Sequence, residues 1–181
     1  MADRAARIRL LALDVDGVLT DNGVYLGPVA GQRVELKRFD IQDGLGHTLL
    51  RQVSFDVAWV SGRFSEATSL RAAELRVQHL IQAEDGRKIP PMQALLNRIG
   101  IAWDEVAFVG DDLADLPVLA RVGLPIAVAN AVPEVKAVAQ HVTTAVGGHG
   151  AVREVIEWLL RARGQWDAAL GGYLRSREQH D

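Results

Sequence analysis

The sequence contains no cysteine, so disulfide bonds and thiolate metal sites are excluded. No apolar run approaches the roughly 20 residues that span a bilayer, and residues 1–7 lack the long apolar core of a signal peptide. The net charge at pH 7 is −3, without the basic excess typical of nucleic-acid-binding proteins. We therefore expect a cytoplasmic protein that binds neither membranes nor nucleic acids.

Internal repeats and low-complexity tracts are also absent, and at 181 residues the chain has the length of one domain. We expect this domain to occupy residues 1–164. Residues 165–181 are mostly polar, and we expect them to form a flexible C-terminal tail. Its apolar residues have near-helical spacing and could dock on another surface; they are Trp166, Leu170, Tyr173 and Leu174.

Short apolar runs alternate with segments of helical periodicity along most of the chain. We expect strands at residues 8–15, 55–60, 79–81, 106–109, 125–128 and 142–144, and helices near 45–51, 65–75, 91–99, 113–121, 132–139 and 151–163. This alternation is typical of βαβ units, and the nearly all-apolar strands indicate helices on both faces. The predicted fold class is α/β, a Rossmann-like three-layer sandwich with a mainly parallel sheet.

One segment interrupts this alternation shortly after the first strand. Within residues 22–38, two short runs of alternating polarity flank a turn rich in Gly and Pro, which predicts a β-hairpin. Because an isolated hairpin is only marginally stable in water, we expect this insertion to pack on another surface, such as that of a neighbouring subunit.

The most informative local feature is the pair of carboxylates that ends the first apolar run. Asp14 and Asp16 are two positions apart, so strand alternation puts them on the same side, and Gly17 follows directly. Both fall beyond the carboxyl edge of the sheet, where open α/β sheets bind ligands. Two acids there can hold a divalent cation, and one can attack an electrophile while the other transfers a proton.

Further polar groups follow later strands and therefore converge on the same edge of a parallel sheet. They are Ser61-Gly62-Arg63, Lys88 and Gly110-Asp111-Asp112-Leu113-Ala114-Asp115. Acidic clusters, a hydroxyl group and an ammonium group together suit a phosphoryl group with Mg²⁺ as its counter-ion. The two other lysines of the chain, Lys37 and Lys136, lie outside this pattern.

These four segments, in this order, resemble the four motifs of the haloacid dehalogenase superfamily of phosphatases. Residues 16–21, 39–44, 110–117 and 147–154 further resemble one subfamily, the 3-deoxy-D-manno-octulosonate (KDO) 8-phosphate phosphatases. The resemblance implies no separate cap domain, and a homotetramer in which the hairpin of one subunit helps to cover the site of the next. It also implies Mg²⁺ as cofactor and a sugar-acid phosphate as substrate, hydrolysed for lipopolysaccharide synthesis.

The same resemblance implies a role for each catalytic residue. Asp14 would attack phosphorus and form an aspartyl-phosphate, and Asp16 would protonate the leaving sugar oxygen and then deprotonate the hydrolytic water. Mg²⁺ would be held by the Asp14 carboxylate, the Asp16 backbone carbonyl and Asp111. Lys88 would supply positive charge where negative charge grows in the transition state, although the adjacent Arg87 leaves a second register for this cation.

The remaining motif residues would bind phosphate or support the residues that do. Phosphate oxygens would accept hydrogen bonds from Ser61 and from the Gly62 amide. Asp112 and Asp115 would orient metal-bound waters or Lys88.

Several residues have structural alternatives that the sequence leaves open. Arg63 could contact substrate or form an ordinary salt bridge, and Arg153 could bind the substrate carboxylate or pair with an acid of its own helix. Asp112 could cap the helix that follows it. His149 could touch the sugar, but a loop histidine is more often simply at the surface.

Other functions also remain open at this point. The same chemistry could act on a nine-carbon, sialic-acid-type sugar phosphate, and a silent relative could serve as a binding subunit, although all motif side chains are intact. A signalling receiver domain also has acids, Ser/Thr and Lys at one sheet edge. Its phosphate-accepting aspartate ends the third strand, whereas here residues 79–82 contain no aspartate and Asp14 ends the first.

Overall fold

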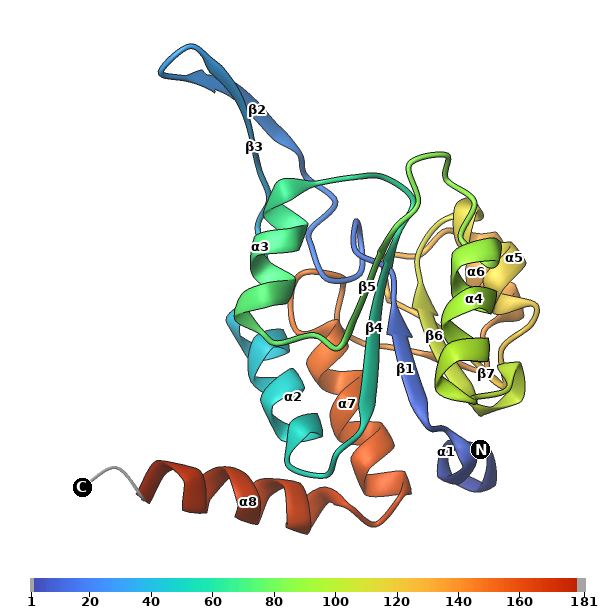
Figure 1. Ribbon diagram of the computed structural model, residues 1–181. Coiled ribbons are helices and arrows are strands. Elements are labelled where there is room, and N and C mark those ends of the chain that lie inside the picture. The colour runs from blue at the N-terminus through green and yellow to red at the C-terminus, as the bar shows by residue number, and fades with distance from the viewer. Residues whose placement is uncertain (1, 179–181) are drawn as a thin grey trace.

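The computed structural model of the protein describes residues 2–178, and its centre is a six-stranded sheet (Figure 1). All its strand pairs are parallel, in the order β5-β4-β1-β6-β7-β8. The strands are β1 (Leu10–Leu13), β4 (Asp56–Ser61), β5 (His79–Gln82), β6 (Val106–Gly110), β7 (Leu124–Ala127) and β8 (His141–Val142). Every residue of β1, β6 and β7 is buried, as expected for parallel strands covered on both faces.

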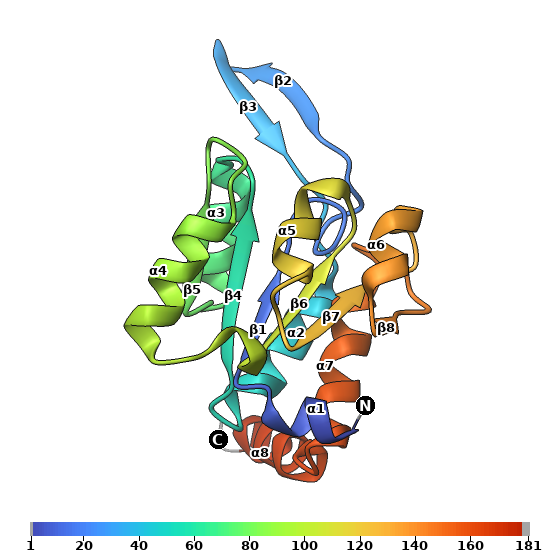
Figure 2. The same ribbon diagram turned by 90° about the vertical axis from the view of Figure 1, so that its right-hand side faces the viewer.

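Helices form the two outer layers of the sandwich (Figures 1 and 2). One face carries α2 (Ile41–Arg51), α3 (Glu66–Glu74) and α7 (Ala151–Ala162), and the other carries α4 (Ile89–Ile99), α5 (Leu116–Leu119) and α6 (Pro133–Val138). The 3₁₀ turns η1 (Trp103–Glu105) and η2 (Leu113–Asp115) precede β6 and α5. The predicted α/β sandwich is confirmed. The helix expected at 113–121 is divided between η2 and α5, and the first strand is shorter than the expected 8–15.

Local chemistry explains where the helices begin and end. The Asp40 carboxylate accepts the Gln42 amide at the start of α2, and the Ser65 hydroxyl accepts the Thr68 amide at the start of α3, which satisfies amides that lack helical partners. Prolines occupy the first turn of α4, where no amide donor is needed, and Gly100 ends that helix with φ +65°.

The insertion after β1 is a hairpin, as the sequence predicts. Strands β2 (Tyr25–Val29) and β3 (Gln32–Leu36) pair antiparallel. Ala30 and Gly31 turn the chain with φ of +51° and +79°, values that match the twist of tight hairpins. The hairpin projects beyond the carboxyl ends of the central strands (Figures 1 and 2). Its exposed apolar side chains include Tyr25, Leu26, Val29 and Leu36.

Two helices lie at the opposite end of the molecule from the hairpin (Figure 1), and the sequence predicted neither. They are α1 (Ala2–Arg7) and α8 (Trp166–Glu178). Helix α8 packs against α2 and α7 and buries Ala169. Residues 166–178 of the segment expected to be a flexible tail therefore form a helix, and residues 179–181 lie outside the described part. No helix within residues 2–178 combines the length and apolarity that crossing a membrane requires.

A buried carboxylate joins α2 to α7. The N-cap residue of α7 is Gly150, which has no side chain to cap the helix, and Asp43 of α2 instead accepts a hydrogen bond from the Arg153 amide at 2.7 Å. Burial raises the pKa of Asp43 to about 6; the charge of Asp40 adds to this rise, whereas the hydrogen bonds from the α7 amides oppose it. Asp43 therefore caps α7 from a neighbouring helix.

We expect Asp43→Ala to lower the free energy of unfolding by about 1–2 kcal/mol, since it removes a cap. Asp43→Asn keeps an acceptor for the Arg153 amide and should lose less. Urea unfolding followed by circular dichroism measures both variants.

The two variants also test the raised pKa of Asp43. Because its folded pKa exceeds the unfolded value of about 3.9, the contribution of the protonated carboxyl to stability is complete below about pH 4 and is lost as the pH rises through about 6. Wild type should therefore lose stability relative to Asp43→Asn over this range. A difference between them that is independent of pH would contradict the assignment.

Candidate functional site

The segments singled out in the sequence meet in one pocket at the carboxyl ends of β1, β4 and β6. The pocket lies beside the base of the hairpin. Its walls are Asp14, Asp16, Asn22, Gly62, Arg63, Gly86, Lys88, Asp111, Asp112, Ala114 and Asp115. The β1 and β6 loops supply its carboxylates, and the segment after β5 supplies its lysine. The sheet topology therefore produces the convergence that the sequence predicts.

Lys88 links two of the carboxylates in this pocket. Its ammonium group lies 2.5 Å from Asp14 Oδ1 and 2.7 Å from Asp115 Oδ1, and its side chain is almost completely buried. Burial alone lowers the pKa of Lys88, but the charges of Asp14 and Asp115 outweigh burial and the pKa is raised. Arg87, the alternative cation, is exposed and pairs with Asp85, so the structure selects Lys88.

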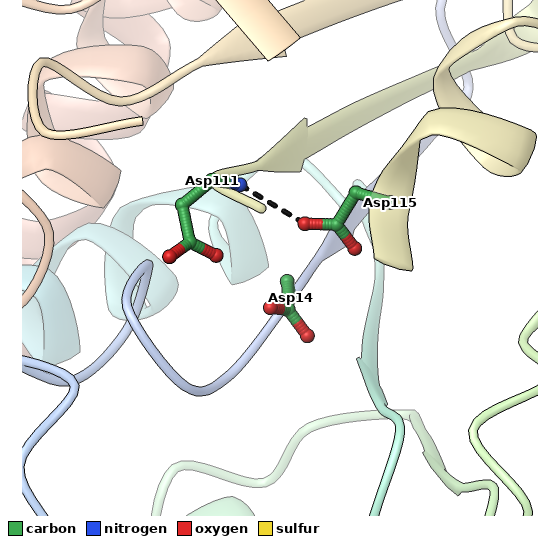
Figure 3. A group of neighbouring side chains, drawn as sticks. All are labelled: Asp14, Asp111 and Asp115. Carbon is green, nitrogen blue, oxygen red and sulfur yellow. Dashed lines mark hydrogen bonds between the residues drawn. The ribbon is translucent and has the colours of Figure 1, made fainter. Parts of the chain in front are cut away.

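Three carboxylates crowd together at the centre of the site (Figure 3). Oxygens of Asp14, Asp111 and Asp115 all lie within 4.8 Å of one another. Burial, followed by the negative charge of Asp115, raises the pKa of Asp14 to about 7; burial and the charge of Asp14 raise the pKa of Asp111 to about 8. Such crowding suits a divalent cation, which would favour the ionised form of each carboxyl.

The three carboxylates do not offer equal ligands to a cation. Asp115 Oδ1 is bound to Lys88, and Asp115 Oδ2 accepts the Asp111 amide at 2.9 Å and the Asp112 amide at 3.4 Å. Asp111 Oδ1, by contrast, is buried and has no hydrogen-bond partner within residues 2–178. Asp14 and Asp111 are therefore the better candidates for holding a metal, and Asp115 supports its neighbours. Asp112 caps η2 by accepting the Leu113 amide at 2.7 Å.

The Asp16 carboxylate points away from this cluster, toward the base of the hairpin. Its Oδ1 lies 2.7 Å from the Lys37 ammonium, and its Oδ2 lies 3.2 Å from Arg63 Nε. The side chain is therefore not one of the clustered acids, and the main-chain carbonyl of Asp16 as a metal ligand stays a prediction from the family resemblance.

Glu35 of β3 completes a ring of alternating charges, which we call the hairpin-base ring. It comprises Asp16, Arg63, Glu35 and Lys37. The Glu35 carboxylate accepts hydrogen bonds from both terminal nitrogens of Arg63, at 2.9 and 3.0 Å. One of its oxygens lies 3.8 Å from the Lys37 ammonium group. The hydrogen bond from Arg63 holds the pKa of Glu35 down to about 2 in spite of partial burial. Arg63 thus forms salt bridges, which was one of the two roles left open by the sequence, and it also lines the pocket.

Sequence reasoning missed Glu35 and set Lys37 aside. The available signal was their spacing: Glu35 and Lys37 are two positions apart at the end of β3, so strand alternation would put them on one side. Which surface that side meets depends on how the base of the hairpin packs against the β1 loop and α3.

Close backbone contacts fix the loop that follows β1. Gly17 has φ +90°, and a Cβ there would lie 2.0 Å from Asp111 Oδ2. A Cβ at Gly147 would lie 1.7 Å from the Gly17 carbonyl oxygen. Asn130 joins these glycines, since its side chain accepts the Gly147 amide at 2.7 Å and donates to the Gly17 carbonyl at 3.4 Å. No pattern in the sequence indicated this role for Asn130.

Some predicted site residues do not line the pocket. Arg153 pairs with Glu157 of its own helix at 2.6 Å, and His149 contacts Arg38 and the Gly147 carbonyl. Ser61 is buried at the end of β4, where its hydroxyl donates to the Arg63 carbonyl at 2.9 Å. For Arg153 the structure therefore shows the helix-acid alternative; the functional roles of His149 and Ser61 stay predictions.

Known proteins share both the sequence and the fold. Residues 72–156 match the family model of haloacid dehalogenase-like hydrolases. The KDO 8-phosphate phosphatase of Escherichia coli is 44% identical over 168 residues, which cover 93% of this chain and 87% of the relative. The crystal structure of the Yersinia pestis KDO 8-phosphate phosphatase superposes with a TM-score of 0.86 at 42% identity, covering 92% of this chain and 88% of that one.

A third relative was crystallised with ligands. The KDO 8-phosphate phosphatase of Moraxella catarrhalis, in complex with a magnesium ion, a phosphate ion and KDO, has a TM-score of 0.88 at 37% identity over 95% of this chain and 97% of its own. The similarity extends over nearly the whole chain. The chain therefore belongs to the KDO 8-phosphate phosphatases, a family of phosphoric monoester hydrolases within the haloacid dehalogenase-like hydrolases.

Proposed function

We propose that this chain hydrolyses KDO 8-phosphate to KDO and phosphate, through an aspartyl-phosphate intermediate and with Mg²⁺ as cofactor. The observation that carries the proposal is the Asp14 carboxylate, held between the Lys88 ammonium and the Asp111 carboxylate. The substrate is supported by relatives of this name at 42–44% identity. The released sugar would serve lipopolysaccharide synthesis, and a cytoplasmic location stays a prediction from the sequence.

The donor set fits a hard, oxygen-loving cation. The Asp14 carboxylate, the Asp16 main-chain carbonyl and Asp111 would hold Mg²⁺, and the unpartnered Oδ1 of Asp111 supports this assignment. When bound, Mg²⁺ supplies positive charge that lets an anionic carboxylate approach an anionic phosphate.

The side chains of this chain then divide the reaction between them. Asp14 attacks phosphorus in line, and Lys88 orients the Asp14 carboxylate and offsets negative charge in the transition state. Asp16 gives a proton to the departing sugar oxygen as the phosphorus–oxygen ester bond breaks. Asp16 then takes a proton from the water that attacks the aspartyl-phosphate, so that Asp14 and Asp16 both return to their starting state.

The segments at the ends of β4 and β5 would bind the phosphate. Gly62 lines the pocket, and its amide would donate to a phosphate oxygen together with the Ser61 hydroxyl. Asp115 accepts hydrogen bonds from Lys88 and from the Asp111 amide. It therefore fixes the Lys88 ammonium group relative to Asp111, the proposed metal ligand.

We further propose that the chain forms a homotetramer in which each hairpin covers the pocket of a neighbouring subunit. A group of large apolar side chains on the hairpin supports this proposal: Tyr25 is 58%, Leu26 55%, Val29 62% and Leu36 62% exposed. Exposed apolar clusters of this kind mark interaction surfaces, and a lone hairpin gains stability from packing.

A panel of phosphorylated sugar acids tests the proposed reaction. Phosphate release with Mg²⁺ should be fastest from KDO 8-phosphate, and Asp14→Asn should abolish turnover while the fold persists, since the nucleophile is lost. Faster turnover of a nine-carbon sugar-acid 9-phosphate would show that the proposed substrate is wrong. If no sugar phosphate releases phosphate, the chain is better explained as a silent binding subunit.

Magnesium affinity should rise with pH. Because the pKa values of Asp14 and Asp111 are raised to about 7 and about 8, both carboxyls are largely protonated at low pH and must lose protons to bind metal. Titration calorimetry between about pH 6 and about pH 8 should show tighter binding at the higher pH, with proton release. Asp111→Asn is the control, and an affinity that is constant across this range would argue against these ligands.

Acidic substitutions on the hairpin should dissociate the assembly. We expect Leu26→Asp combined with Val29→Asp to give a smaller species in light scattering and a lower turnover number, because the apolar contact is lost. Leu174→Asp on α8 is the matched control, since Leu174 is 50% exposed on the helix at the far end of the molecule (Figure 1). A wild-type chain that is monomeric throughout would refute the tetramer.

A further inference from the structure

Lys37 is a buried cation that the proposed mechanism leaves without a task. Its side chain is 0% exposed, although it lies just beyond β3 at the base of an otherwise exposed hairpin. Its ammonium group lies 2.7 Å from Asp16 Oδ1 and donates to Thr68 Oγ1 at 3.1 Å. Thr68 belongs to α3 and is itself buried. Burying an ammonium group is costly unless it is fully paired, so these contacts define one position for it.

The contacts of Asp16 distinguish its two carboxylate oxygens. Oδ1 is buried and accepts no hydrogen bond within residues 2–178, so its 2.7 Å contact with the Lys37 ammonium group is an ion pair. Oδ2 lies 3.2 Å from Arg63, whose side chain is 38% exposed, and Asp16 lines the pocket. Since Oδ1 is buried, Oδ2 is the oxygen that remains for a group entering the pocket.

We propose that Lys37 is a positioning residue that holds Asp16 Oδ1 and thereby presents Oδ2 as the atom that transfers the proton. This inference rests on the proposed phosphatase function. In the first step the Asp14–phosphorus bond forms, the ester bond breaks, and the proton of Oδ2 passes to the leaving alkoxide. In the second step Oδ2 takes a proton from the attacking water as the Asp14–phosphorus bond breaks. Lys37 changes no bond in either step.

The arrangement of the hairpin-base ring explains why a lysine is needed in addition to Arg63. Both terminal nitrogens of Arg63 are bound by Glu35, and only its Nε reaches Asp16. With Arg63 alone the Asp16 carboxylate could rotate and exchange its two oxygens. A second cation on the opposite oxygen removes this freedom, and positional errors near 1 Å can cost about 10²-fold in rate.

Leaving-group chemistry separates this role from a structural one. An alkyl sugar phosphate needs a proton on its leaving oxygen, whereas p-nitrophenolate departs without one. Lys37→Met should therefore slow the first turnover of KDO 8-phosphate by about 10²-fold and leave the first-turnover burst from p-nitrophenyl phosphate nearly unchanged, with little effect on KM. Lys37→Arg should restore part of the lost rate, because it returns a positive charge beside Oδ1.

Lys136→Met is the matched control, since Lys136 is exposed on α6, and it should behave as wild type.

If Lys37→Met does not fold, Thr68→Val provides the test: it removes the second contact of the ammonium group and should produce the same leaving-group dependence with a smaller loss. Equal losses on both substrates, or no loss on either, overturn the role of Lys37 while the phosphatase proposal stands. A wild-type chain that hydrolyses neither substrate overturns both.

Discussion

The proposed reaction depends on one electrostatic constraint: the carboxylate of Asp14, its proposed nucleophile, must be buried and yet ionised. Asp14 shares its surroundings with Asp111 and Asp115, and burial raises its pKa to about 7. Lys88 offsets part of this negative charge at 2.5 Å, but one ammonium group cannot balance three carboxylates. The arrangement therefore stores an unfavourable charge distribution that a divalent cation would relieve. Selection for stability alone would not retain it.

The sequence was sufficient to predict the parts of the site that depend on local structure. Asp14, Lys88 and Asp111 each follow a strand of a parallel sheet, and the carboxyl ends of such strands share one edge whatever the detailed packing. The order of the strands was not needed for this prediction. The core of the fold was predictable for the same reason, since strand periodicity and helix signals are both local.

Contacts made by tertiary packing were not predictable in this way. Lys37 meets Asp16, and Glu35 meets Arg63, because the base of the hairpin packs beside the β1 loop, and no local pattern specifies that placement. Helix α8 illustrates the same limit: it contains Gly171 and Gly172, which disfavour helix, but a Cβ at Gly172 would lie 2.8 Å from Gln52 Oε1. Close packing at the end of α2 therefore uses a glycine that local propensity counts against a helix.

Two aspartates of the same loop are held in opposite surroundings. Asp14 faces carboxylates and a single ammonium group, whereas Asp16 faces Lys37 and Arg63. Attack and proton transfer need different environments, and the division follows from which elements each side chain meets. Since Lys37 and Glu35 belong to the hairpin, any displacement of the hairpin alters the surroundings of Asp16 before those of Asp14. In the proposed mechanism and assembly, one hairpin position would therefore orient the proton donor of its own subunit and cover the pocket of a neighbour.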